Sequence, residues 1–378
     1  MTAIDKKTWD IFCRVIDNYG DIGVCWRLAR QLAIEHPVRV RLWVDEIDSL
    51  IHIWPETARV EQQIIENVDV RIWHQDFDQN ILPADVIIEA FACNLPDSYL
   101  TAMKNEIVSP RWFNLDYLSA EKWVEGCHGL LSTHPQLGLK KMFFFPGFTP
   151  KTGGVLKEKS LLIDQKSFLS DPTNPRQFLK KLGVRAQNNE LIISLFGYEN
   201  NAVASLLSSW ENSQTPILCL VPPSKILTSI TFCLGKHLKV GDEFEQGSLR
   251  LKVIPFLTQT DYDMLLWSCD LNFIRGEDSF VRAQWAAKPF VWHIYPQDDD
   301  AHIIKLDAFL NLYLDHADPE LKSSVSTLWH QWNRAEPCDQ SWNLCLENLP
   351  AWQKHSQDWC LRLDSQTDLV SNFIASAQ

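Results

Sequence analysis

Short apolar runs alternate along this chain with longer segments whose apolar residues recur at helical spacing. In the first half, we predict strands at residues 9–15, 38–44, 68–72, 85–88 and 111–115, and a buried strand that ends in a turn at 143–148. The spacing predicts helices between several of them, as at residues 22–34 and 97–105. Strands that alternate with helices in this way indicate a parallel, doubly wound α/β sheet.

A second alternating series occupies the other half of the chain. The pattern predicts strands at residues 191–196, 216–221, 249–254, 271–274 and 289–293. It predicts helices at residues 202–210, 259–269, 279–286 and 301–314, and a mainly helical tail from about Asp318. Two series of this kind predict two sheets rather than one.

The chain has 378 residues, which is long for a single core and favours two domains. Residues 149–175 mix Lys, Gly, Ser, Asp and Pro and are the best candidate for a linker. We therefore expect Rossmann-like domains at residues 1–155 and 176–354, with a C-terminal helix at about 355–378 packed back on the first. Two such domains that face each other across a cleft form the GT-B architecture of glycosyltransferases, and such a cleft is a natural ligand site.

Charge and cysteine content narrow the class of protein. The net charge of −13 argues against nucleic acid or an anionic membrane as a partner. Ten scattered cysteines without a Cys-x-x-Cys pair are typical of reduced thiols in a cytoplasmic protein. The sequence shows neither a signal peptide nor an apolar run long enough to span a membrane, and we expect a monomer.

The loop after the first predicted strand contains two aspartates, Asp17 and Asp21, together with Gly20 and Gly23. Open α/β sheets bind ligands at the carboxyl ends of their strands, so this pair indicates acid/base or cation-binding chemistry. The Gly-x-Gly-x-x-Gly fingerprint of dinucleotide sites and the Walker A lysine are both missing. Structural roles stay open: Asp21 could cap the following helix, and Asp17 could form a turn.

A second polar loop, Arg275-Gly276-Glu277-Asp278-Ser279, lies between a predicted strand and a predicted helix. The N–H groups at the helix start, the helix dipole and Arg275 could together hold a diphosphate. The alternative is a well-capped surface helix.

Aromatic and amide side chains follow other predicted strands of the second half. A nucleobase could stack on them and hydrogen bond to them, although aromatics after strands are more often part of a core. These candidates are Phe196, Tyr198, Phe256, Gln259 and Tyr295.

The two polar loops carry a resemblance to a known family. Residues 17–23, which read Asp-Asn-Tyr-Gly-Asp-Ile-Gly, residues 26–30 and residues 273–279 are similar to motifs of the EarP family. These bacterial enzymes are protein-arginine rhamnosyltransferases that act on translation elongation factor P. The motifs lie in order in both halves, so the resemblance spans nearly the whole chain.

The resemblance implies an inverting GT-B glycosyltransferase that moves L-rhamnose from dTDP-β-L-rhamnose to one arginine of elongation factor P. It implies that Asp21 is the general base and that Asp17 and Glu277 are further essential carboxylates. The residues expected to bind dTDP-rhamnose are Asn18, Tyr19, Gly20, Phe196, Tyr198, Phe256, Gln259, Arg275, Gly276, Asp278, Ser279 and Tyr295.

The chemistry of arginine fits these assignments. A guanidinium is a poor nucleophile because its pKa lies above about 12 and its lone pairs are delocalised. We therefore expect Asp21 to accept a proton, Asp17 to orient the guanidinium and Glu277 to help hold donor or acceptor. A single displacement inverts the sugar without an enzyme nucleophile, and Arg275 would stabilise the departing dTDP.

Two other functions remain open from the residues alone: a GT-B-like sugar-nucleotide epimerase and a non-catalytic protein-binding module. We expect no cofactor and no metal. The Asp-x-Asp pairs at 76/78 and 261/263 match a pattern of metal-dependent transferases, but such tripeptides are common by chance.

Overall fold

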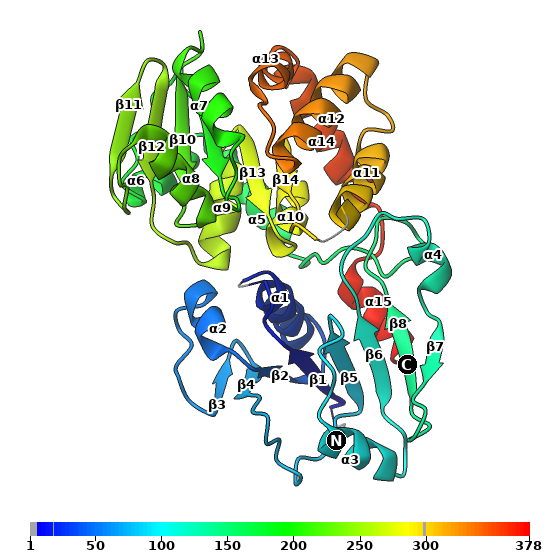
Figure 1. Cartoon of the computed structure of the whole chain (residues 1–378). Coiled ribbons are helices and arrows are strands. Elements are labelled where there is room, and N and C mark those ends of the chain that lie inside the picture. Colours follow the sequence, from blue (N-terminus) through cyan, green and yellow to red (C-terminus); the bar gives the residue numbers. More distant parts are fainter. Residues whose placement is uncertain (1–5, 18, 298–299) are drawn as a thin grey trace. The chain divides into compact units, whose positions relative to one another are not determined.

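The computed structural model describes residues 6–17, 19–297 and 300–378, and its chain divides into two compact units (Figure 1). Unit 1 contains the described residues up to Lys159 together with Ser365–Gln378. Unit 2 is Ser160–Asp364. Each unit is built on its own sheet, so the two alternating series of the sequence correspond to two α/β units.

Unit 1 contains an eight-stranded sheet in the order β3-β4-β2-β1-β5-β6-β8-β7. Its strands are β1 (Thr8–Cys13), β2 (Arg39–Val44), β3 (Gln62–Ile65), β4 (Val68–Ile72), β5 (Val86–Ala90), β6 (Arg111–Leu115), β7 (Leu131–Thr133) and β8 (Lys140–Phe144). The pairs from β4 to β8 are parallel, and the edge strands β3 and β7 are antiparallel to their neighbours. The parallel strands therefore have the Rossmann order, which reverses between β1 and β5.

Helices complete unit 1. They are α1 (Gly20–Glu35), α2 (Ile47–Ile53), α3 (Asp97–Asn105), α4 (Val124–Cys127) and the C-terminal α15 (Leu369–Ser376). Every residue of β5 is buried, as expected for a central strand whose two faces are both covered. Helix α1 contacts α15, so the first and the last helix of the described residues both belong to this unit (Figure 1).

Unit 2 contains a six-stranded sheet in the order β11-β12-β10-β9-β13-β14. Its strands are β9 (Leu191–Leu195), β10 (Ile217–Val221), β11 (Glu243–Gln246), β12 (Leu249–Val253), β13 (Leu271–Arg275) and β14 (Phe290–His293). All pairs are parallel except β11–β12. The order again reverses once, between β9 and β13.

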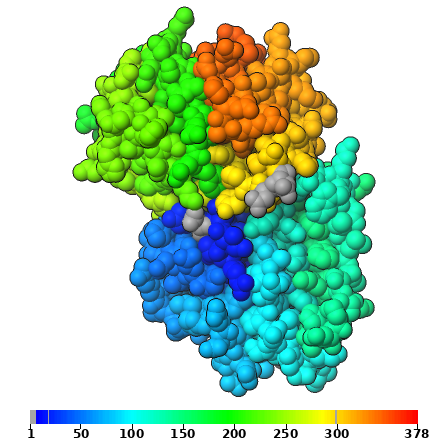
Figure 2. All heavy atoms as spheres, in the orientation of Figure 1, coloured from blue at the N-terminus to red at the C-terminus, as the bar shows by residue number. Residues whose placement is uncertain are grey.

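The helices of unit 2 follow its strands and then form its C-terminal part. They are α5 (Leu161–Ser170), α6 (Asn174–Lys181), α7 (Val203–Glu211), α8 (Lys225–Leu234), α9 (Gln259–Ser268), α10 (Asp278–Trp285), α11 (Ala301–Tyr313), α12 (Pro319–Asn333), α13 (Asp339–Glu347) and α14 (Leu349–Asp364). Helix α13 contacts both α12 and α7, so the orange surface of these late helices adjoins the green surface of α7 in Figure 2.

The boundary between the two units, after Lys159, lies within the predicted linker, but much of that segment is helical. Helix α5 lies inside residues 149–175, and α6 begins there as well. Contacts distant in sequence hold α5: Leu161 is buried, and Gln165 donates from Nε2 to the carbonyls of Trp285 and Ala286 at 3.1 and 2.9 Å. Local composition does not reveal such contacts.

The C-terminal segment from 355 onward divides between the units. Helix α14 ends at Asp364 and belongs to unit 2, whereas α15 belongs to unit 1. Phe373 of α15 stacks on Phe144, with ring centroids 3.7 Å apart, and meets Phe113 edge to face at 5.4 Å. These contacts bury the last helix against the sheet of unit 1.

Three short strands at the sheet edges are absent from the sequence-based prediction: β3, β7 and β11. Each pairs with one neighbour only and carries exposed residues, so the alternation of apolar and polar positions is weak.

Within the described residues, no helix has the length and apolar character required to cross a membrane. All ten cysteines, every one of which is described, are free thiols.

Candidate active site

The loop between β1 and α1 holds both aspartates of the first motif. The N–H of Gly20 donates to the carbonyl of Asp17 at 2.7 Å, which closes the turn that begins the helix. A Cβ added at Gly20 would lie 3.1 Å from Oδ2 of Asp17. The glycine therefore permits a close approach of the helix start to the first carboxylate. Asn18, also expected here, lies outside the described residues.

The carboxylate of Asp21 is turned back toward the loop. Its Oδ2 accepts hydrogen bonds from the backbone N–H groups of Ile16 and Asp17, at 2.8 and 3.0 Å. Both donors precede the helix, so Asp21 lies in the first turn of α1 but does not cap it. The capping role left open from the sequence is wrong, because the carboxylate accepts N–H groups of the loop before the helix rather than those of the helix itself.

Opposing influences act on the pKa of Asp21. Burial raises the pKa, because the side chain is only 2% exposed and the charged form is poorly solvated. The backbone N–H groups of Asp17 and Ile16 and the hydroxyl of Tyr117 lower it, while the negative charge of Asp17 raises it. The net direction is upward, which makes this carboxylate a stronger base than an ordinary aspartate.

Sequence reasoning missed Tyr117, which follows β6. Its hydroxyl donates to Oδ1 of Asp21 at 3.0 Å, and its ring stacks on Phe91 with centroids 4.3 Å apart. The one signal in the sequence was its position just after a predicted strand, at the carboxyl edge of the sheet. That signal does not single out Tyr117 among the residues that follow the other strands.

In unit 2, residues that were predicted to bind the sugar nucleotide lie at the carboxyl ends of β9 and β13. Arg275 is 7% exposed, and its guanidinium lies over the rings of Phe196 and Tyr198, 4.9 and 5.0 Å from their centroids. Nη1 of Arg275 also lies 3.5 Å from the hydroxyl oxygen of Tyr198. The two strands are the pair at which the strand order reverses, where ligands of this fold class bind.

The turn from β13 into α10 contains the loop that was predicted to hold a diphosphate. Gly276 has a φ of +65°, which favours glycine, and Trp292 donates from Nε1 to its carbonyl at 3.0 Å. Glu277 occupies the N-cap position of α10, and Asp278 and Ser279 begin the helix. The backbone N–H groups of this first turn therefore lie beside Arg275.

Other predicted donor residues belong to the same unit. Gln259 at the start of α9 donates from Nε2 to Oδ2 of Asp278 at 3.3 Å. Tyr295 is 48% exposed and meets Tyr198 edge to face, with centroids 5.5 Å apart. Phe256 is half-buried in the segment between β12 and α9. Tyr295 therefore contacts one of the aromatic rings that surround Arg275. Phe256 lies in the segment that leads into α9.

His293, at the end of β14, is a buried residue of this region that the sequence did not suggest. Its ring lies edge to face with Tyr198 at 5.1 Å, and Nδ1 has no hydrogen-bond partner among the described residues. Burial lowers the pKa of His293 to about 3, with further contributions from Arg275 and His302. The imidazole is therefore neutral at physiological pH.

The Asp-x-Asp pair at 261/263 has structural roles. The hydroxyl of Thr258 accepts the N–H of Asp261 at 3.1 Å and caps α9. Asp263 forms a buried, bidentate pair with Arg282, at 2.9 and 2.7 Å. Across the described residues, no group of three or more His, Cys, Asp or Glu could hold a metal ion.

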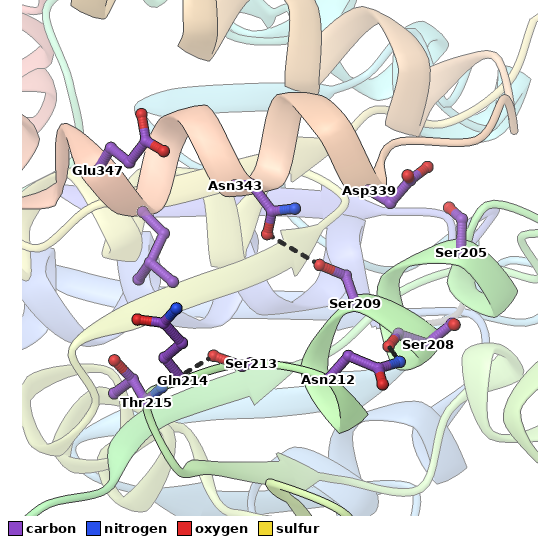
Figure 3. Close-up of a pocket in the computed structure, with 11 residues that line it drawn as sticks. Ser205, Ser208, Ser209, Asn212, Ser213, Gln214, Thr215, Asp339, Asn343 and Glu347 are labelled. Carbon is purple, nitrogen blue, oxygen red and sulfur yellow. Dashed lines mark hydrogen bonds between the residues drawn. The ribbon is translucent and has the colours of Figure 1, made fainter.

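A polar groove of about 770 Å³ in unit 2 lies away from these residues (Figure 3). It lies between α7 and α13, where Ser209 donates to Oδ1 of Asn343 at 3.0 Å. Thr215, another lining residue, precedes β10 and therefore lies at the amino edge of the sheet. The groove includes none of the predicted site residues.

Comparisons with known proteins identify the family of the chain. Residues 9–378 match the model of a family described as EarP, the elongation factor P (EF-P) rhamnosyltransferase. The chain belongs to the EarP family. A protein-arginine rhamnosyltransferase of Pseudomonas putida is 47% identical over 98% of both chains. One from Neisseria meningitidis is 36% identical over 97% of both.

Solved structures confirm the predicted fold class. An EarP-family structure from work on EarP-mediated arginine glycosylation of translation elongation factor EF-P covers 98% of both chains, with 34% identity and a TM-score of 0.70. A glycosyltransferase from Rickettsia africae has 10% identity and a TM-score of 0.54, which shows the shared fold alone. The EarP resemblance read from the two loops is thus confirmed, and the chain is a glycosyltransferase with the α/β fold class of GT-B enzymes.

Proposed function

We propose that this EarP-family chain transfers L-rhamnose from dTDP-β-L-rhamnose to an arginine side chain of elongation factor P, with inversion at the anomeric carbon. The observation that carries the proposal is the buried Asp21 carboxylate, which has a raised pKa and lies beside Asp17. The names of the relatives and of the matched family support the same acceptor and sugar.

The transfer is one displacement in this proposal. A guanidinium nitrogen forms the new bond to the anomeric carbon as the bond from that carbon to the β-phosphate oxygen breaks. The electron pair of the broken bond leaves with dTDP, and Asp21 accepts the proton that the nitrogen loses. Asp17 orients the guanidinium, and Glu277 helps to hold either the sugar nucleotide or the acceptor arginine.

Unit 2 binds the sugar nucleotide in this proposal. Arg275 and the first-turn N–H groups of α10 balance the charge that develops on the diphosphate. Phe196, Tyr198 and Tyr295 supply aromatic surface for the nucleoside, and Arg275 itself lies against two of these rings. Because protein groups supply this positive charge, we propose that no metal or other cofactor is required. We also propose that the enzyme acts as a monomer.

The first test is the intact mass of elongation factor P after incubation with the enzyme and dTDP-rhamnose. We expect a deoxyhexose increment that maps to one arginine, with activity retained in EDTA. An altered sugar nucleotide without a modified protein would instead indicate an epimerase. Binding of elongation factor P without binding or turnover of dTDP-rhamnose would indicate a protein-binding module.

Substitutions test the assigned carboxylates. Asp21→Asn should lower kcat by about 10²–10⁴, the usual loss when a general base is removed. Glu277→Gln should lower kcat/KM. The matched control is Asp85→Asn, because Asp85 also accepts a backbone N–H, from Thr8 at 2.7 Å, but lies at the opposite edge of the sheet of unit 1. Near-normal turnover by Asp21→Asn would refute the base assignment.

A further inference from the structure

The hydrogen bonds of Asp21 distinguish its two carboxylate oxygens. Oδ2 accepts two backbone N–H groups, those of Ile16 and Asp17. Oδ1 accepts the hydroxyl of Tyr117, and no other described group lies within hydrogen-bond distance of it. A carboxylate oxygen has two lone-pair positions, so Oδ2 is saturated and Oδ1 retains one acceptor position.

The ring of Tyr117 is itself held in place. It lies nearly parallel to Phe91, with an interplanar angle of 14°. Phe91 has a φ of +54°, an unusual conformation that its N–H stabilises by donating to the carbonyl of Leu115 at 2.7 Å. Further along this loop, the N–H of Asn94 donates to the buried carboxylate of Glu89 at 3.2 Å. The segment after β5 therefore forms a fixed support for the tyrosine.

We propose that Tyr117 is a positioning residue for the transfer reaction, because its hydroxyl holds Oδ1 of Asp21 in one orientation and directs the remaining lone pair to the acceptor guanidinium. The inference rests on the proposed function and deepens it. Asp21 removes the proton, whereas Tyr117 acts only through Asp21. A general base is effective only when its accepting lone pair is aimed at the proton that it removes.

Removal of this hydroxyl also has a predictable effect on protonation. The Tyr117 hydroxyl favours the charged form of Asp21, so its loss raises the pKa of the carboxyl group. A hydrogen bond with Cys25, together with burial, raises the pKa of the Cys13 thiol well above its ordinary value, so that neighbour stays neutral. Asp17 in its own loop, Tyr117 after β6 and Cys13 on β1 are the titratable groups that interact with Asp21. Cys25 on α1 and Asp45 after β2 interact with Cys13.

The test is the pH dependence of rhamnosylation by Tyr117→Phe. We expect the acid limb of kcat/KM to move upward by about one pH unit, the shift that corresponds to one hydrogen bond to a charged group. We also expect kcat to fall by about tenfold with KM for elongation factor P nearly unchanged, because orientation is lost and binding is retained.

The matched control is Tyr99→Phe. Tyr99 is a second tyrosine of unit 1 whose hydroxyl donates to an aspartate, Asp10. Tyr99 lies within α3, and its aspartate partner is not Asp21. Its substitution should change stability without moving the acid limb. An equal shift in both variants would show a general effect of losing a tyrosine hydroxyl and would overturn the inference.

A second readout does not depend on turnover. The carboxyl resonance of Asp21 in protein labelled with ¹³C-aspartate can be assigned by its disappearance in Asp21→Asn and then titrated. Its midpoint should rise in Tyr117→Phe, and an unchanged midpoint would overturn the inference. A wild-type enzyme that leaves elongation factor P unmodified would instead refute the proposed function, so the two failures are distinguishable.

Discussion

Burial gives two residues of the candidate site unusual proton affinities, in opposite chemical senses. The charged form of Asp21 is disfavoured, which raises its pKa, and the charged form of His293 is disfavoured, which lowers its pKa. The aspartate remains hydrogen bonded to three donors, so its charge is tolerated where a base is needed. The neutral histidine avoids placing a second positive charge beside Arg275.

His293 predicts a pH-dependent stability. Its pKa is about 3 in the folded state against an ordinary value of 6.5, so the unfolded chain binds its proton first as the pH falls. The contribution of neutral His293 to the free energy of unfolding is therefore fully present above about pH 6.5. It is lost progressively down to about pH 3, with a slope that approaches about 1.4 kcal/mol per pH unit. His293→Phe should remove this part of the slope in urea unfolding.

The control for this titration is His237→Gln, which alters an exposed histidine of the same unit. It should leave the pH dependence of the unfolding free energy as in the wild type. If His293→Phe also retains the wild-type slope, the buried imidazole is not its source.

At the scale of elements, the local sequence pattern predicts some helices and strands, whereas others depend on tertiary contacts. The strands at 68–72 and 111–115 have the bounds expected from their sequence. In the first, Val68, Val70 and Ile72 alternate with polar residues, which is a local signal for a strand. Helix α5 was missed because distant partners order it, whereas the three-residue edge strand β7 was missed because its apolar and polar positions alternate only weakly. Loop glycines predicted both polar turns, but they could not predict that the Asp21 carboxylate turns away from its helix.

The start of α15 allows a test of one such element. The Asp368 carboxylate accepts the N–H groups of Val370 and Ser371, at 3.0 and 3.1 Å, and Nε2 of Gln31 at 3.2 Å. Asp368→Ala should lower the free energy of unfolding of unit 1 by about 1–2 kcal/mol, the cost of losing a helix cap. Chemical denaturation of both proteins provides the measurement.

Asp318→Ala is the matched control for the cap. Asp318 occupies the N-cap position of α12, but its side chain makes no capping hydrogen bond within the described structure. Its substitution should change stability by a few tenths of a kcal/mol at most. A comparable loss in both variants would show that the cap geometry of Asp368 is not the cause.

At the scale of the whole molecule, the chain begins and ends in the same unit. Residues 365–378 return to unit 1 after all of unit 2 has been completed. Lys7 donates from Nζ to the carbonyl of Ala377 at 3.2 Å, and Asn372 donates to that of Gly153 at 3.0 Å. Unit 1 therefore reaches its full set of contacts only when the last residues of the chain are present.

Phe373→Ala tests this dependence. The side chain is fully buried against Phe144 and Phe113, so its truncation should cost about 3–5 kcal/mol. Hydrogen exchange followed by mass spectrometry should show faster exchange in residues 6–159 and little change in unit 2. Phe232→Ala, at an 88% exposed phenylalanine of α8, should leave both units unchanged. Equal loss of protection in both units of Phe373→Ala would contradict the assignment of α15 to unit 1 alone.

The sequence by itself determined the two alternating series of strands and helices, the two polar loops and the family. Those features depend on residues close together in the chain, where periodicity, glycine conformation and helix-start chemistry act. The tertiary structure alone decided that Tyr117, 96 residues from Asp21, holds its carboxylate and that the final helix completes unit 1. Long-range packing makes those contacts, and no local pattern of residues specifies which distant partner a buried group will meet.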